Sequence, residues 1–131
     1  MARSSRAPLP ERQAAERRGR RAERIAAWYL RLKGYGILAR RFRGPLGEID
    51  LVVKRRGTLV FVEVKARADD DTGFEAVGPK ARARLAHAAE SWLTRYPAAA
   101  ALRLRFDVIV ISPGFSWPRH LKNAFGAGGH V

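Results

Sequence analysis

The sequence contains no cysteine, one methionine and three histidines among its 131 residues. The absence of cysteine excludes a disulfide framework, a thiolate metal site and a thiol nucleophile. His87, His120 and His130 are too few for a histidine-rich metal centre. No apolar stretch approaches the roughly 18 to 20 residues of a membrane span. We therefore expect a soluble, cytoplasmic protein with no membrane partner.

Acidic residues are also scarce, since 12 Asp and Glu stand against 26 Lys and Arg and give a net charge of +14. Basic side chains that neutralise phosphates release condensed counterions, so such a charge indicates a polyanionic partner. The segment 1–24 is rich in arginine, but the remaining residues are also basic. Nucleic acid is the expected partner, with an anionic membrane surface or simple solubility as the alternatives.

The length predicts one domain that can bury a core without disulfides or structural metals. We expect a disordered basic tail over residues 1–12, a single domain over 13–125 and a flexible end over 126–131. No internal repeat or second domain is visible in the sequence.

Hydrophobic periodicity predicts a helix, three strands, a second helix and a further strand. In chain order these elements cover residues 12–33, 35–42, 47–55, 58–65, 79–96 and 102–111. In the first strand we expect Ile37 and Leu38 to be core residues. After the last strand we expect Trp117, Leu121 and Phe125 to cap the core. This order predicts an α/β fold with a mixed sheet flanked by helices.

The central hairpin carries charge beside purely aliphatic faces. Ile49, Leu51 and Val53 alternate with other residues in one strand, as do Val60, Val62 and Val64 in the next, and each set is expected to share a face. A two-residue loop at Arg56-Gly57, with glycine supplying positive φ, would bring Val53 opposite Val60.

The same register predicts Asp50 opposite Glu63, and Glu48 opposite Lys65. Like charges so placed are destabilising, and Mg²⁺ or Mn²⁺ would neutralise the two carboxylates while leaving room for a phosphate. Lys65 could then hold a water and offset transition-state charge. The alternative is a solvated strand face with a Glu48–Lys65 ion pair.

Asp50 followed by Glu63-Val64-Lys65 resembles the Asp…Glu-x-Lys signature of the PD-(D/E)xK nuclease superfamily, with Ile49 where the motif's name has proline. A longer ordered set resembles the YraN family of small bacterial proteins, which are predicted endonucleases similar in fold to archaeal Holliday-junction resolvases. That set comprises Gly19-x-x-Ala22-Glu23, Tyr29-Leu30, Gly34-Tyr35-x-Ile37-Leu38, Gly47-Glu48-Ile49-Asp50-Leu51, Val60-Phe61-Val62-Glu63-Val64-Lys65, Arg105-Phe106-Asp107-Val108 and Asn123-Ala124-Phe125.

The resemblance covers nearly the whole chain and implies a restriction-endonuclease-like core of order αβββαβ. It implies a Mg²⁺- or Mn²⁺-dependent DNA endonuclease that favours branched or distorted DNA, and a symmetric dimer by analogy. Asp50, Glu63 and the Val64 carbonyl would bind the metal, with Lys65 as a catalytic residue. Glu23 would complete the site, whereas the residues alone also allow an exposed helix glutamate paired with a neighbouring arginine. Glu48 is either an accessory ligand or structural.

Several basic residues are expected to contact the nucleic-acid backbone. They are Arg40, Arg41, Arg43, Arg67, Lys80 and Arg84. The loop at Gly44-Pro45-Leu46-Gly47 is either a plain turn or a place of close approach to nucleic acid. The acidic triplet at 69–71 lacks the spacing of a calcium loop and is expected to be a flexible loop. Asp107 is expected to pair with an arginine or orient a strand.

Two other functions fit the same residues. One is a nucleic-acid-binding module that keeps a nuclease scaffold without turnover, and the other is an RNA-processing nuclease.

Overall fold

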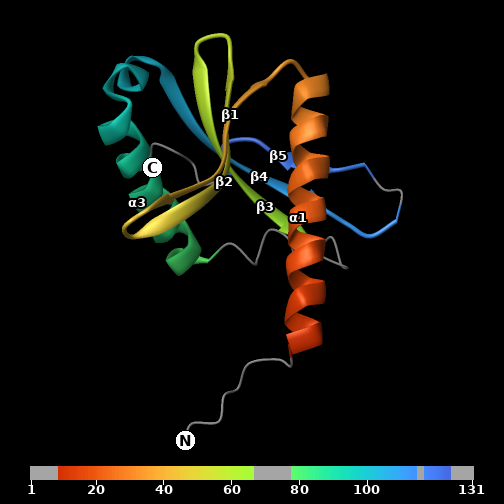
Figure 1. Cartoon of the computed structure of the whole chain (residues 1–131). Coiled ribbons are helices and arrows are strands. Elements are labelled where there is room, and N and C mark those ends of the chain that lie inside the picture. Colours follow the sequence, from red (N-terminus) through yellow and green to blue (C-terminus); the bar gives the residue numbers. More distant parts are fainter. Residues whose placement is uncertain (1–8, 67–77, 115–116, 125–131) are drawn as a thin grey trace, which may run out of the picture.

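The computed structural model describes residues 9–66, 78–114 and 117–124. A five-stranded sheet lies between two long helices, which cover its opposite faces (Figure 1). In chain order the elements are α1 (Leu9–Leu32), β1 (Gly36–Gly44), β2 (Gly47–Arg55), β3 (Thr58–Ala66), α3 (Pro79–Arg95), the 3-10 helix η1 (Pro97–Ala101), β4 (Arg103–Ile111) and β5 (Arg119–Leu121). In the part of the chain described here, no helix is both long enough and apolar enough to cross a membrane.

The strand order is β1-β2-β3-β4-β5, and only the β3–β4 pair is parallel. A parallel pair needs a crossover connection, and α3 lies between β3 and β4 in the chain, as such a connection does. The mixed sheet with flanking helices confirms the predicted α/β class. The order α1, β1, β2, β3, α3, β4 is compatible with a restriction-endonuclease-like core.

The first helix begins at Leu9, inside the segment 1–12 that the sequence assigned to the tail. Its buried residues are Ala22, Ala26, Ala27 and Leu30, which follow the helical period of the predicted stripe. It ends at Leu32, and Gly34, with φ 92°, is the C′ residue that stops it, as predicted. The N–H groups of Gly34 and Tyr35 donate to the carbonyls of Arg31 and Leu30, a Schellman arrangement that satisfies the last turn.

The hairpin of β2 and β3 has the predicted register. Val53 pairs with Val60, and Arg55 pairs with Thr58, so Arg56 and Gly57 form the two-residue loop. The positive φ of 56° belongs to Arg56, whereas Gly57 is outside the left-handed region. The prediction that the glycine supplies the positive φ was therefore wrong.

Strand regularity breaks at two places, and both breaks overturn an expected side-chain direction. The β1–β2 register shifts between Ile37 and Ala39, so Leu38 is 49% exposed instead of lying in the core. Arg41 has φ 57°, and the regular pairing skips it. Beyond that point Ile49 faces the opposite side of the sheet from Leu51, which contradicts the predicted common face.

Two cores result, one on each face of the sheet. The core under α1 includes Leu30, Leu51, Val53, Val60 and Val62. The core under α3 is formed by a second set that includes Ile49, Val52, Phe61, Leu85 and Trp92. The run 108–111 of β4 is buried throughout, as predicted for a strand covered on both faces.

The C-terminal cap differs from the prediction. Trp117 is 70% exposed, so it does not seal the core, although its ring lies 6.3 Å from that of Tyr29. Leu121 does pack against Val108 and Val110, because it belongs to β5, a strand too short for periodicity to predict. Phe125 lies outside the described residues.

Candidate active site

The site forms where the β2–β3 ladder stops. Regular pairing ends at Leu51 and Val62, one residue before Asp50 and Glu63. The Val64 N–H donates to Asp50 Oδ2 at 2.8 Å. In a longer ladder this N–H would donate to a backbone carbonyl, and here a carboxylate accepts it instead. Asp50 and Glu63 are therefore not paired within the ladder as predicted. They instead face a common cleft.

Burial, together with the charges of Glu63, Glu23 and Glu48, raises the pKa of Asp50 to about 7. The hydrogen bond from the Val64 N–H opposes this rise because it favours the carboxylate. Near neutral pH, Asp50 therefore exists in both protonation states. A carboxyl group perturbed in this way, in a cleft, is a signal of a functional site.

Lys65 makes its ion pair with Glu63, with Nζ 3.0 Å from Oε2. Both side chains are largely buried, so the pair is less screened than a surface pair. Glu48 pairs instead with Arg43 of the neighbouring strand at 3.3 Å. The predicted alternative of a Glu48–Lys65 pair is therefore wrong, because the strands part before either residue reaches the ladder.

Glu23 leans from α1 toward the sheet. Its side chain is only 14% exposed, and Oε1 accepts a hydrogen bond from Arg41 Nε at 2.9 Å. This contact and the charge of Glu23 raise the pKa of Arg41. The interpretation of Glu23 as an exposed helix glutamate is therefore wrong, and its charge reaches Asp50.

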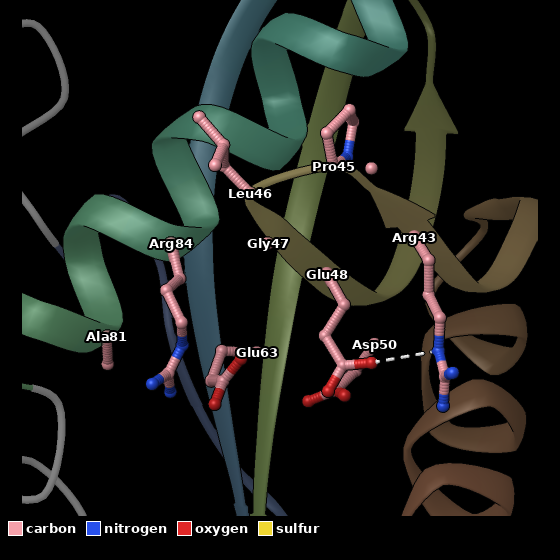
Figure 2. Close-up of a pocket in the computed structure, with 10 residues that line it drawn as sticks. Arg43, Pro45, Leu46, Gly47, Glu48, Asp50, Glu63, Ala81 and Arg84 are labelled. Atoms are coloured by element: carbon pink, nitrogen blue, oxygen red, sulfur yellow. Dashed lines mark ion pairs between the residues drawn. The ribbon is translucent and has the colours of Figure 1, made fainter.

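A cleft of about 520 Å³ opens beside these groups. Figure 2 shows the carboxylates of Glu48, Asp50 and Glu63 and the guanidinium of Arg84 on the same side of it. The remaining lining comes from Arg43, Ala81 and the turn between β1 and β2. The cleft therefore joins carboxylates to two arginines that could meet a phosphate.

Glycine at the turn serves close packing against α3. A Cβ on Gly47 would overlap the Arg84 carbonyl oxygen, and one on Gly44 would meet Ser91 Oγ. Neither glycine has a positive φ, so close packing and not an unusual backbone dihedral explains them. Their packing fixes the β1–β2 hairpin on the helix that carries Arg84.

The donor set suits a hard divalent cation. Over residues 9–66, 78–114 and 117–124, no three Asp, Glu or His side chains form a metal-binding group. Mg²⁺, however, is commonly held by one or two carboxylates with waters. Glu23, Glu48 and Glu63 each have a basic partner, whereas Asp50 forms no ion pair with any described residue. Asp50 is thus the carboxylate left open to the ion, whereas Glu63 lines the same cleft but is paired with Lys65, and roles for Glu63 and the Val64 carbonyl stay predictions.

The predicted nucleic-acid contacts divide into three groups. Arg43 and Arg84 line the cleft. Arg40 and Lys80 are exposed but do not line it, and Arg41 is engaged with Glu23. Arg67 and the acidic triplet at 69–71 lie outside the described residues.

One buried polar network was only partly predicted. Asp107 is fully buried and, as expected, pairs with Arg105 at 2.8 Å. It also contacts His120 Nε2 at 2.7 Å, while His120 Nδ1 lies 2.8 Å from Lys33 Nζ. Burial by itself raises the pKa of Asp107, but hydrogen bonds from His120, Arg105 and the Asn123 N–H outweigh it and lower that pKa. The network joins α1, β4 and β5 and lies apart from the cleft, so we assign it to stability.

Comparison with known proteins gives a consistent family. Residues 22–111 match the model described as "Uncharacterised protein family UPF0102". A UPF0102 protein of Rhodopseudomonas palustris (strain BisA53) is 55% identical over 120 residues, which cover 92% of each chain. One from Parvibaculum lavamentivorans is 54% identical over 112 residues, 86% of this chain and 84% of the relative. One from Methylorubrum extorquens is 50% identical over 118 residues, which cover 90% of this chain and 91% of the relative.

Proposed function

This chain belongs to the UPF0102 family, and we propose that it is a Mg²⁺- or Mn²⁺-dependent DNA endonuclease of the PD-(D/E)xK type. One observation carries the proposal. Asp50 and Glu63 face a cleft walled by Arg43 and Arg84, and Lys65 is bound to Glu63. This is the arrangement of charges that phosphodiester hydrolysis needs.

Each side chain has a chemical task in this proposal. Asp50 and Glu63 would hold the cation, which when bound polarises a phosphate and lowers the pKa of a coordinated water. Lys65 would orient a water and donate to the phosphate oxygens as negative charge develops. Arg43 and Arg84 would position the phosphate backbone. Glu23 would act at a distance, because its charge favours retention of the Asp50 proton until a cation replaces it.

A second function is favoured by a specific observation. The three glutamates beside Asp50 are already neutralised by Arg41, Arg43 and Lys65. If these ion pairs persist, the three glutamates are not available to a metal ion. The protein would then bind DNA through its other arginines and would need no metal. The alternative is therefore a DNA-binding module without turnover.

Cleavage of end-labelled DNA tests the proposal. The substrates are duplex, flap, fork and four-way-junction DNA, with matched RNA, in Mg²⁺ or Mn²⁺ and in chelator. We expect wild type to cut DNA only with the metal, and Lys65→Ala to lose at least a hundredfold in rate, the typical contribution of such a group.

Lys54→Ala is the matched control, since Lys54 is an exposed lysine of β2 outside the cleft. Equal cutting by wild type and Lys65→Ala would refute the assignment of Lys65. Tight binding in chelator with no cutting under any condition would replace the endonuclease by the binding module. Cutting confined to RNA would replace DNA as the substrate.

A further inference from the structure

The tip of the β1–β2 hairpin is an exposed apolar point beside the cleft. Gly44 pairs with Gly47, so Pro45 and Leu46 form a two-residue turn. Leu46 is 66% exposed. A single exposed leucine is ordinary on a protein surface, so its exposure alone carries no function. What distinguishes this one is how it is held and what surrounds it.

Both ends of the turn pack against α3. The backbone at Gly47 and Gly44 packs so closely on α3 that neither position has room for a Cβ. Below the turn, Phe42 and Trp92 pack edge to face with centroids 5.1 Å apart. Proline fixes φ at the first turn residue. An apolar group presented this way loses little conformational freedom when it meets a ligand.

Pro45 and Leu46 also separate two clefts. On one side lies the cleft of Asp50 and Glu63, and on the other a cleft of about 420 Å³. Figure 2 shows both turn residues beside α3, at the end of the cleft away from the carboxylates. The lining of the second cleft adds His87, Glu90, Ser91, Thr94 and Arg95. Its volume is within the range of pockets that bury a small planar molecule.

The surroundings identify the chemistry of the occupant. Arg43 and Arg84 line the first cleft together with its carboxylates, and Arg95 lines the second together with Glu90, so an arginine is present on each side of an apolar point. A strand of nucleic acid has the complementary pattern, with phosphates flanking the flat apolar faces of bases. Apolar side chains that enter between bases unstack them and are a known device of DNA-binding proteins.

We propose that the Pro45-Leu46 turn is a wedge that enters between bases where stacking is already interrupted, and that Leu46 makes the site discriminate such DNA from continuous duplex. The inference rests on the proposed function, because it names the substrate feature that this site selects. An unpaired base displaced by the wedge would lie in the second cleft.

The test measures binding by the full chain in EDTA, so that it does not depend on cleavage. Dissociation constants are compared for a continuous duplex and a forked duplex of the same sequence, with 2-aminopurine at the fork. Wild type should brighten the 2-aminopurine, because unstacking raises its fluorescence. Leu46→Ala should lose the brightening and lower the fork-over-duplex affinity ratio roughly tenfold, as expected for loss of about one stacking contact.

Two further variants control for side-chain identity and position. Leu46→Met keeps an apolar group of similar volume and should retain both signals. Leu38→Ala removes a different exposed leucine, which belongs to β1 and lines neither cleft, and it should leave both signals unchanged. Thermal unfolding of each variant confirms that it is folded.

The outcomes separate the wedge from the nuclease. A Leu46→Ala protein with wild-type brightening and ratio overturns the wedge and leaves DNA binding and cleavage untouched. An equal loss in Leu38→Ala also overturns it. If wild type binds neither DNA in EDTA, the wedge is overturned, and the nuclease proposal fails as well only if wild type cuts no substrate with Mg²⁺ or Mn²⁺.

Discussion

Asp50→Asn should stabilise the folded protein at pH 8. The folded pKa of Asp50 is raised to about 7 by burial and by neighbouring carboxylates, from an ordinary value of 3.8. The protonated form stabilises the fold fully below pH 3.8, and that stability is lost as the pH rises through 7. The loss corresponds to about 4 kcal/mol. Asparagine keeps an oxygen for the Val64 N–H and carries no charge, so the variant avoids the loss.

Urea unfolding at pH 4, 6 and 8 measures the effect at constant ionic strength. The free energy of unfolding of Asp50→Asn should nearly match wild type at pH 4 and exceed it by up to about 4 kcal/mol at pH 8. Added Mg²⁺ at a hundred times its dissociation constant should stabilise wild type by about 2.7 kcal/mol and leave the variant unchanged. This metal readout is independent of activity.

Asp107→Asn is the matched control, because hydrogen bonds from His120 and Arg105 outweigh burial and lower the pKa of Asp107. It should destabilise the protein at pH 8 by roughly 3–5 kcal/mol, since it leaves buried donors without their anion. An Asp50→Asn protein no more stable than wild type at pH 8, or with an equal gain at pH 4, would refute our account of Asp50.

Three other predictions follow from packing and charge. Gly47→Ala should lower the free energy of unfolding by about 1–3 kcal/mol, because its Cβ would overlap the Arg84 carbonyl. Gly57→Ala should have a far smaller effect, because the space around Gly57 is open. Urea unfolding of the two variants measures the difference. Leu30→Ala should cost about 2–5 kcal/mol, since Leu30 is fully buried, and a cost below 1 kcal/mol would contradict that burial. Arg84→Ala should reduce the slope of log K against log salt by about one for DNA binding, and Lys80→Ala, outside the cleft, should weaken binding less.

The helices and the hairpin register were predictable because they depend on local patterns. The buried stripe of α1 follows the helical period, and Gly34 stops the helix through its permissive φ. The two-residue loop at Arg56-Gly57 fixes the pairing of the strands around it. Each of these features depends on residues close together in the chain.

The strand faces were less predictable because they depend on irregular pairing. We expected Ile49 to share a face with Leu51 and Leu38 to be buried, and the structure shows neither. The register shift at Leu38 and the left-handed backbone at Arg41 change which side each residue faces. Neither irregularity leaves a signal in hydrophobic periodicity.

The sequence alone indicated Asp50, Glu63 and Lys65 as site residues, because the predicted register places two like charges opposite each other and near a lysine. In the structure Asp50 and Glu63 line one cleft, and Lys65 pairs with Glu63. Only the tertiary structure decided which charge meets which. It paired Glu48 with Arg43 and Glu23 with Arg41, across elements that periodicity cannot align. Local spacing fixes which residues share a strand or helix face, whereas ion pairs, burial and the pKa of Asp50 depend on how distant segments pack.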